Sequence, residues 1–232
     1  MMHLLVVGGA GYIGSHVVLE AIERGFNVTV FDDLSTGLKE NLNADINLVV
    51  GSTLSNKDLL KLFQDNNFDA VIYLAASKAA GESMLDPVKY AKNNIIGGIN
   101  FLNACLENSI KYFVFSSSAA VYGLPESIPI DESHKLSPTN YYGYTKLAGE
   151  KHIMQISNKY LIISKRNGDL HQKMKVGTNK DGFVQYRNFS DEPLVMVVEE
   201  ETPFIVILMY KPCANESQSY PQKNHSFFLQ SI

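Results

Sequence analysis

Residues 4–16 read Leu-Leu-Val-Val-Gly-Gly-Ala-Gly-Tyr-Ile-Gly-Ser-His, and this stretch decides the fold. A short apolar run, Leu4–Val7, meets glycines at every third position, Gly8, Gly11 and Gly14, and a helical pattern follows. Gly8 allows a tight turn, Gly11 lets the backbone approach a ligand, and Gly14 lets a helix pack closely on the strand. A helix that begins here presents free N–H groups and its positive dipole end to an anion. The stretch therefore predicts a strand, a phosphate-binding loop and a helix.

Asp32 ends the next apolar run, eighteen residues after Gly14. A carboxylate in this position binds both hydroxyls of a ribose and repels a 2′-phosphate. Three glycines alone indicate only a flexible turn, but these lie between a predicted strand and a predicted helix. We therefore predict a dinucleotide site and favour NAD over NADP.

Short apolar runs alternate with segments of helical periodicity over the first two thirds of the chain. The runs are residues 4–7, 28–31, 46–50, 70–74, 112–115 and 161–163. They are continuously apolar, which is typical of parallel strands covered on both faces. Repeated strand–helix units predict an α/β fold of the Rossmann type, with a doubly wound parallel sheet.

The pattern changes after residue 166, where Asn167-Gly168-Asp169 signals a turn. Two apolar runs, 194–198 and 204–210, are predicted to pair as a hairpin. The polar stretch after Cys213 predicts a loop or a frayed tail. The expected units are an NAD-binding Rossmann domain of residues 1–166 and a short atypical C-terminal segment of residues 167–232.

The composition is that of a soluble globular protein. Hydrophobic residues make up 45% of the 232 residues and charged residues 19%, which excludes an intrinsically disordered chain. The net charge of −4 gives no electrostatic reason to expect nucleic acid or an anionic membrane as partner. No run reaches the ~18 apolar residues that span a bilayer, and Met1–Val7 is too short for a signal peptide.

The chain has two cysteines, Cys105 and Cys213. Cys105 lies in an apolar helical pattern, where a buried free thiol is the ordinary interpretation. Neither has a cysteine or histidine at metal-ligand spacing, so we expect neither a disulfide framework nor a metal site. A reducing cytoplasm is therefore the expected location.

A catalytic group is predicted after the fifth apolar run, where residues 116–123 read Ser-Ser-Ser-Ala-Ala-Val-Tyr-Gly. Tyr142 and Lys146 are four residues apart, on one face of a helix announced by residues 137–140, Ser-Pro-Thr-Asn. An ammonium one turn away stabilises a phenolate, so Tyr142 can act as a base near neutral pH. Ser118 can hydrogen-bond the same substrate oxygen and relay its proton. Tyr-x-x-x-Lys is common by chance, but the serine turn and the glycine loop favour the catalytic interpretation.

Together these motifs resemble the UDP-glucose 4-epimerases, NAD-dependent nucleotide-sugar epimerases of the extended short-chain dehydrogenase/reductase superfamily. The resemblance covers about residues 3–166, and its motifs are residues 11–16, Asp32, Lys78, residues 81–83, Asn93, Asn94, Ser118, Tyr142 and Lys146. It implies that Tyr142, assisted by Ser118 and Lys146, takes the proton of a sugar 4-hydroxyl while the C4 hydride passes to NAD. The 4-keto sugar then rotates and accepts the hydride on its other face.

The same resemblance implies a set of binding residues. The expected cofactor contacts are Gly8, Gly11, Tyr12, Ile13, Gly14, Asp32, Lys78, Tyr142 and Lys146, and the expected substrate contacts are Ser118, Asn94 and Tyr142. A solvated loop lysine remains the alternative for Lys78, and a helix cap the alternative for Asn94. Ala119 and Ala120 stand where related 4,6-dehydratases have an acidic pair, which favours epimerisation over dehydration.

The sequence departs from this family at two places. Gly51-Ser52 stands where the family has Gly-Asp, whose acid contacts the adenine; losing that partner costs on the order of 1–2 kcal/mol of NAD binding. After residue 166 no counterpart of the family's substrate lobe is recognisable, so residues 167–232 are expected to be a replaced or truncated segment. Without the nucleotide's binding energy to position the sugar, both rate and affinity are expected to fall.

Three functions therefore stay open. The first is a UDP-glucose 4-epimerase-like enzyme whose partner is a nucleotide sugar of the UDP-glucose or UDP-galactose type. The second is a truncated, catalytically silent NAD-binding remnant, and the third is another short-chain dehydrogenase/reductase. The apolar faces of the predicted helices over 94–107 and 140–156 are expected either to form a homodimer or to pack within the monomer.

Overall fold

The computed structural model describes residues 1–110, 112–128, 130, 134–156, 161–166, 169–174 and 204–210. Its strands are β1 (His3–Val7), β2 (Asn27–Asp32), β3 (Asn47–Val50), β4 (Ala70–Tyr73), β5 (Tyr112–Ser118), β6 (Leu161–Arg166), β7 (Asp169–Met174) and β8 (Phe204–Tyr210). Its α-helices are α1 (Tyr12–Glu23), α2 (Asn56–Gln64), α3 (Ala80–Leu85), α4 (Pro87–Tyr90), α5 (Gly97–Glu107) and α6 (Tyr141–Ile156). Shorter segments are the 3₁₀-helices η1 (Lys39–Asn41) and η3 (Ala119–Val121) and the π-helix η2 (Ala91–Ile96).

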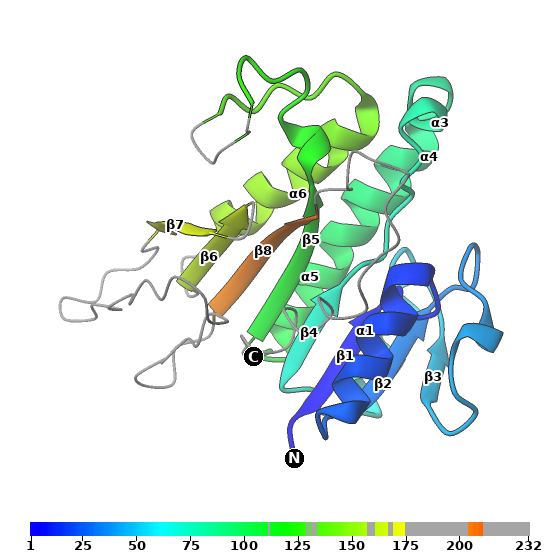
Figure 1. Ribbon diagram of the computed structural model, residues 1–232. Coiled ribbons are helices and arrows are strands. Elements are labelled where there is room, and N and C mark those ends of the chain that lie inside the picture. Colours follow the sequence, from blue (N-terminus) through cyan, green and yellow to red (C-terminus); the bar gives the residue numbers. More distant parts are fainter. Residues whose placement is uncertain are drawn as a thin grey trace, which may run out of the picture.

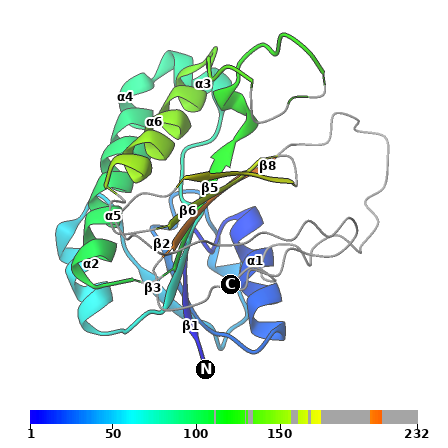
Figure 2. The same ribbon diagram turned by 90° about the vertical axis from the view of Figure 1, so that its left-hand side faces the viewer.

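Within these residues one eight-stranded sheet forms the centre of the fold, in the order β3-β2-β1-β4-β5-β8-β6-β7 (Figure 1). Every ladder is parallel except that between β6 and β7. Helix α1 covers one face of the sheet, and α2, α5 and α6 cover the other (Figure 2). The strand order reverses direction at β1, which is the doubly wound arrangement. The predicted Rossmann-type α/β fold is thus confirmed.

The sheet separates two apolar cores, because successive residues of a strand point to opposite faces. In β1, Leu5 and Val7 belong to the core shared with α2, α5 and α6, whereas Leu4 and Val6 belong to the core shared with α1. All four side chains are buried. This is why the run is apolar without alternation, as expected of a strand covered on both faces.

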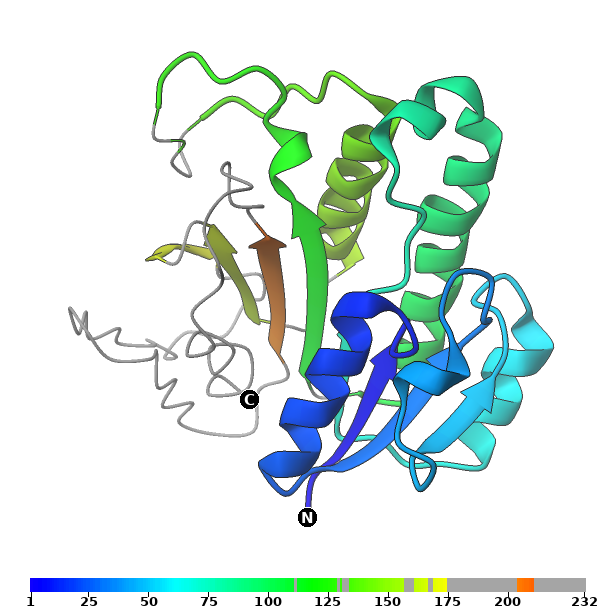
Figure 3. The same cartoon turned by 45° about the vertical axis from the view of Figure 1, so that its right-hand side comes forward.

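Strand β8 comes from the segment that the sequence separated from the Rossmann domain. It lies between β5 and β6 and pairs in parallel with both (Figures 1 and 3). Both of its edges are therefore occupied, so residues 204–210 do not form the predicted hairpin in this sheet; its other half, 194–198, lies outside the described residues. The expected boundary after residue 166 consequently falls inside the sheet.

The antiparallel hairpin in this part of the fold is formed by β6 and β7, which pair from Ile162 with Met174 to Arg166 with Asp169. Asn167 and Gly168 separate the two strands in the sequence. Asn-Gly between two strands is the strongest short-range hairpin signal. The sequence analysis recognised a turn here but did not extend it to a hairpin.

Cys105 is buried in α5 as a free thiol, as predicted. Burial raises the pKa of this thiol well above its usual value, which holds it in the protonated, unreactive form. Cys213 lies outside the described residues. Among the residues that are described, no helix is long and apolar enough to cross a membrane.

Candidate functional site

The carboxyl ends of β1, β4 and β5 meet at one edge of the sheet, because these strands are parallel neighbours. The glycine loop follows β1, the loop with Lys78 follows β4, and Ser118 ends β5. Doubly wound sheets bind their ligands at this edge, near the point where the strand order reverses. The topology therefore brings together three segments that the sequence analysis had selected.

Glycine is required at the loop between β1 and α1. Gly8 has a φ of +80°, and a Cβ there would lie 2.7 Å from the backbone nitrogen of Ala75. A Cβ at Gly14 would lie 2.7 Å from Cα of Gly9 and would overlap the carbonyl oxygen of Gly8. Gly11 caps α1 without a side-chain hydrogen bond. The first N–H groups of α1 are thus left for an anionic ligand.

Asp32 is held beside this loop at the end of β2. Its side chain is buried, and its two carboxylate oxygens accept hydrogen bonds of 2.9 Å from the backbone N–H groups of Ala10 and Leu34. Leu34 adopts a positive φ of 57° to make this contact, a conformation that costs energy for a non-glycine residue. The backbone therefore fixes the carboxylate next to the glycine loop, where the sequence placed it.

Three of the expected cofactor contacts are exposed. Tyr12 and Ile13, in the first turn of α1, have exposed fractions of 75% and 41%. Lys78 is exposed in the loop after β4. Within the described residues no hydrogen bond or ion pair occupies the Lys78 ammonium, so it is available to an anion at this edge of the sheet.

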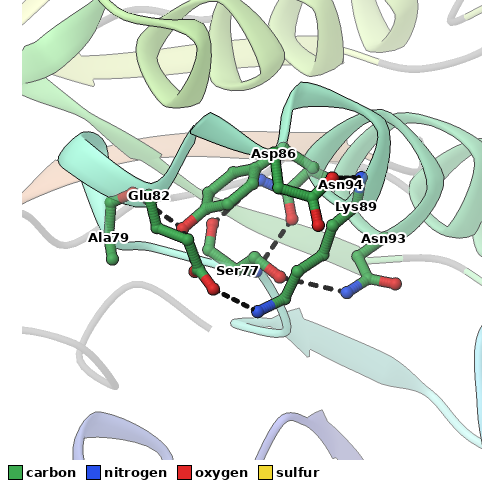
Figure 4. A network of polar contacts seen from close by, with 8 residues as sticks. Ser77, Ala79, Glu82, Asp86, Lys89, Asn93 and Asn94 are labelled. Carbon is green, nitrogen blue, oxygen red and sulfur yellow. Dashed lines mark hydrogen bonds and ion pairs between the residues drawn. The ribbon is translucent and has the colours of Figure 1, made fainter. Parts of the chain in front are cut away.

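Asn94 joins the Lys78 loop to helix α6 through hydrogen bonds to Ser77, drawn in Figure 4, and to Thr145. Its side-chain oxygen accepts a 2.8 Å hydrogen bond from Ser77 N, and its amide nitrogen donates to Ser77 O and to Thr145 Oγ1, both at 2.9 Å. Both N–H bonds of this buried amide are therefore used inside the protein. The structure thus gives Asn94 a role that the sequence analysis did not consider, in a π-helical segment of the kind frequent at functional sites.

A second set of polar contacts holds the other end of this loop. The Tyr90 hydroxyl lies 2.7 Å from Ala79 O and 2.8 Å from Glu82 Oε2, and Lys89 Nζ pairs with Glu82 Oε1 at 2.6 Å. Figure 4 shows Glu82 and Lys89 meeting beside Ala79. Burial, together with the neighbouring Glu82 carboxylate, raises the pKa of Tyr90 to about 12. Tyr90 therefore stays a neutral hydrogen-bond donor that pins the loop.

Ser118 ends β5, and Tyr142 lies in the first turn of α6. The Ser118 Oγ accepts a 3.2 Å hydrogen bond from Ala120 N, which fixes the serine at the turn into η3. Tyr142 N donates a 3.0 Å hydrogen bond to Oγ of Ser83, a fully buried residue of α3. Burial raises the pKa of the Tyr142 hydroxyl, and a hydrogen bond with Ser118 opposes this rise. Ser118 is thus close enough to the Tyr142 hydroxyl to act on its pKa.

Lys146 lies below Tyr142 on the same face of α6. Its ammonium is buried, donates a 2.8 Å hydrogen bond to Ser116 O, and stands 5.1 Å from the ring centroid of Phe115 and 6.0 Å from that of Tyr142. Burial lowers the pKa of Lys146 to about 8, while the charge of Glu150 acts in the opposite direction. A cation poised near neutral pH beside a tyrosine is what a tyrosine base requires.

The sequence analysis gave no role to Ser83, Thr145 and Glu150, which are all buried in or against helix α6. Thr145 also donates a 2.7 Å hydrogen bond to Tyr142 O. A detectable signal was present for Glu150, because it follows Lys146 by four residues, the spacing at which helical side chains meet. Its burial, however, was not evident from the sequence.

A glycine loop at a helix N-terminus, with a strand-end carboxylate beside it, defines a dinucleotide-binding Rossmann domain. The family model described as "NAD dependent epimerase/dehydratase family" matches residues 4–166. The chain belongs to this family.

Similar proteins are UDP-sugar epimerases. The chain is 46% identical over 150 residues to a UDP-glucose 4-epimerase of Halalkalibacterium halodurans, covering 65% of this chain and 45% of the relative. It is 42% identical over 155 residues to a bifunctional UDP-glucose 4-epimerase and UDP-xylose 4-epimerase of Pisum sativum, covering 62% and 44%. The chain thus spans less than half the length of these curated relatives.

Solved structures show the same likeness. A UDP-glucose 4-epimerase from Brucella ovis in complex with NAD is similar with a TM-score of 0.66 and 35% identity, covering 75% of this chain and 56% of that one. A UDP-glucose 4-epimerase with UDP-glucose from Thermotoga maritima is similar with a TM-score of 0.67 and 33% identity, covering 71% and 55%.

Proposed function

We propose that this chain binds NAD and carries the proton-transfer group of a nucleotide-sugar 4-epimerase of the UDP-glucose type. The observation that carries this proposal is the buried ammonium of Lys146, which lies 6.0 Å from the Tyr142 ring centroid. Ser118 supports it, because it lowers the pKa of the Tyr142 hydroxyl. Ser118 ends β5, at the same edge of the sheet as the glycine loop after β1, and Tyr142 and Lys146 lie on α6. The chain's similarity to UDP-glucose 4-epimerases over the same residues supports the choice of reaction.

The residues present fit NAD. The loop around Gly8 and Gly14 has no room for a Cβ, as a backbone cradle for a pyrophosphate requires. The proposed cofactor contacts are Gly8, Gly11, Tyr12, Ile13, Gly14, Asp32, Lys78, Tyr142 and Lys146. Bound NAD supplies a reversible hydride acceptor. Asp32 favours the unphosphorylated ribose because its fixed carboxylate repels a 2′-phosphate.

The chain's own residues move the proton. Tyr142 accepts it from the sugar 4-hydroxyl, Ser118 hydrogen-bonds the same oxygen, and Lys146 stabilises the tyrosinate by its charge. After the 4-keto sugar has turned so that the opposite face of C4 is reduced, Tyr142 returns the proton to the 4-oxygen. Ala119 and Ala120 provide no acid or base that would expel water. Epimerisation, and not dehydration, therefore suits this site.

The sugar is proposed to be carried on a uridine diphosphate, as in the relatives, with Ser118, Asn94 and Tyr142 at the sugar. Because the Asn94 amide is committed to Ser77 and Thr145, its proposed contact uses the remaining lone pair of its side-chain oxygen. NAD binding without turnover is the second candidate function. The end of the family match at residue 166 favours it.

We also propose a homodimer through the helices over 94–107 and 140–156. A hollow of about 400 Å³ opens between α5 and α6, lined by apolar side chains that include Ile99, Leu102 and Leu147. His152 also lines it, and among the described residues its buried Nε2 has no hydrogen-bond partner. An apolar hollow with an unsatisfied polar atom is what a second subunit would cover. A cytoplasmic location remains part of this proposal.

The decisive experiment is epimerisation of UDP-galactose by the purified chain with added NAD, beside a Tyr142→Phe variant. Turnover that disappears in the variant supports the epimerase. Folded, NAD-bound protein without turnover supports the second candidate. Sedimentation velocity on the chain and on Ile99→Arg tests the dimer, which the variant should dissociate; a chain that sediments as a monomer contradicts it.

A further inference from the structure

Glu150 is a buried acid that the proposed reaction does not use. It lies on α6, one helical turn after Lys146 and two after Tyr142, with 1% of its surface exposed. Glutamate is almost never fully buried unless it is paired. Burying a carboxylate costs free energy that its surroundings must offset, so its place beneath the site calls for a function.

Three consecutive serines of β5 face three successive turns of this helix. Ser118 lowers the pKa of the Tyr142 hydroxyl, the carbonyl of Ser116 accepts a 2.8 Å hydrogen bond from Lys146 Nζ, and the buried Ser117 Oγ donates to Glu150 Oε1. The end of β5 thus acts on Tyr142, Lys146 and Glu150, which follow one another along one face of α6. This register would be lost if either element slid by one residue.

Lys146 needs a negative charge to remain an ammonium. Its hydrogen-bond partner from β5 is a neutral carbonyl, and the Phe115 ring 5.1 Å away gives a cation–π contact but no negative charge. Burial alone favours the uncharged amine. Within the described residues, the charge that acts on Lys146 is that of Glu150.

Other titratable groups on the elements packed against α6 do not take this place. They are Glu82 on α3, Lys89 and Tyr90 on α4, Lys92 on η2, Cys105 and Glu107 on α5, and Tyr112 on β5. Glu82 is committed to Lys89 and Tyr90. Burial keeps the Cys105 thiol protonated.

We infer that Glu150 is a positioning residue that holds Lys146 as an ammonium against Ser116 and beneath Tyr142. The chemical reason is a series of two electrostatic interactions along one face of α6. The carboxylate maintains the ammonium, and the ammonium in turn favours the tyrosinate. The inference deepens the proposed function at the same site, but its test needs neither cofactor nor turnover.

The test is an NMR titration of the chain labelled with ¹³C at the lysine Cε, with Lys146→Met to assign the signal. In the unaltered chain the Lys146 pKa is expected near 8. In Glu150→Gln, which keeps the shape and an acceptor for Ser117, the protonation constant of Lys146 should fall at least tenfold. Glu150→Asp keeps the charge and should stay within threefold of the unaltered chain.

An unchanged Lys146 protonation constant in folded Glu150→Gln would overturn the inference, because the carboxylate would then exert no hold on the ammonium. If Glu150→Gln does not fold, the test is the protonation state of Glu150 in the unaltered chain. It is read from the side-chain carboxyl ¹³C signal of Glu150, which is assigned by comparison with Glu150→Asp. An ionised Glu150 at pH 7 is expected, and a protonated one overturns the inference. Absence of epimerase turnover leaves this measurement unaffected, so the two proposals fail separately.

Discussion

The ammonium of Lys146 stands 6.0 Å from the ring centroid of Tyr142, and both side chains are mostly buried. Burial acts on the two groups with opposite consequences. It lowers the pKa of Lys146 to about 8 and raises the pKa of Tyr142. Both shifts favour a neutral pair, so the proposed tyrosinate–ammonium pair depends on the groups that oppose the effect of burial, namely Ser118 at the hydroxyl and Glu150 at the amine.

The lowered Lys146 pKa predicts a stability that rises with pH. Between pH 8 and the ordinary lysine pKa of 10.5, the unfolded chain binds more protons at this site than the folded chain. The free energy of unfolding should therefore rise, relative to Lys146→Met, by about 1–2 kcal/mol from pH 8 to 9.5. Urea unfolding of both proteins measures this difference. A pH-independent difference would show that Lys146 has its ordinary pKa in the fold.

Gly14→Ala should weaken NAD binding at least tenfold, because the new Cβ collides with the backbone of Gly8 and Gly9 and displaces the loop. Calorimetric titration with NAD measures the loss. Gly81→Ala is the matched control, since no atom lies within 4 Å of a Cβ at Gly81. Equal affinity of the two variants would mean that the loop does not form the cofactor site.

Ser83→Ala should destabilise the fold by about 1–2 kcal/mol, because it leaves the buried Tyr142 N–H without its acceptor. The same change releases the first turn of α6 from α3. Ser35→Ala serves as control, since its hydroxyl contacts Asp33 at an exposed site, and should change the unfolding free energy by less than about 0.5 kcal/mol. Chemical denaturation at pH 7 compares the three proteins; equal midpoints and slopes would refute the role of Ser83.

Much of the fold was predictable from the sequence because its signals are local. The apolar runs of β1 and β4 are buried on both faces, so hydrophobicity alone marks them. Tyr142 and Lys146 were found because a helix converts a spacing of four residues into a shared face. The glycine loop was found because its glycines lie between a predicted strand and a predicted helix, and Ser118 because it follows the fifth apolar run in a motif of the family.

The remainder depends on partners that are distant in the sequence. Asn94 is bound to Ser77, 17 residues away, and to Thr145, 51 residues away, and no local pattern specifies such contacts. The position of β8 between β5 and β6 depends on which strand edges of the whole sheet are free to pair. An apolar run of seven residues fits a hairpin or a central strand equally well, so only the tertiary structure distinguishes them.

Asp32→Asn should change the choice of cofactor more than the fold. One amide oxygen replaces the two oxygens that accept from Ala10 and Leu34, so the loop loses one hydrogen bond. The negative charge that repels a 2′-phosphate is lost as well. We expect the dissociation constant for NAD to rise about tenfold, a loss of about 1.4 kcal/mol. The dissociation constant for NADP should rise less or fall, so that the NAD-to-NADP preference shrinks.

Parallel titrations with the two cofactors measure this ratio, and thermal unfolding without cofactor controls for the fold. A preference that is unchanged in the folded variant would show that the Asp32 carboxylate does not face the ribose, and that the selectivity for NAD arises elsewhere in the loop.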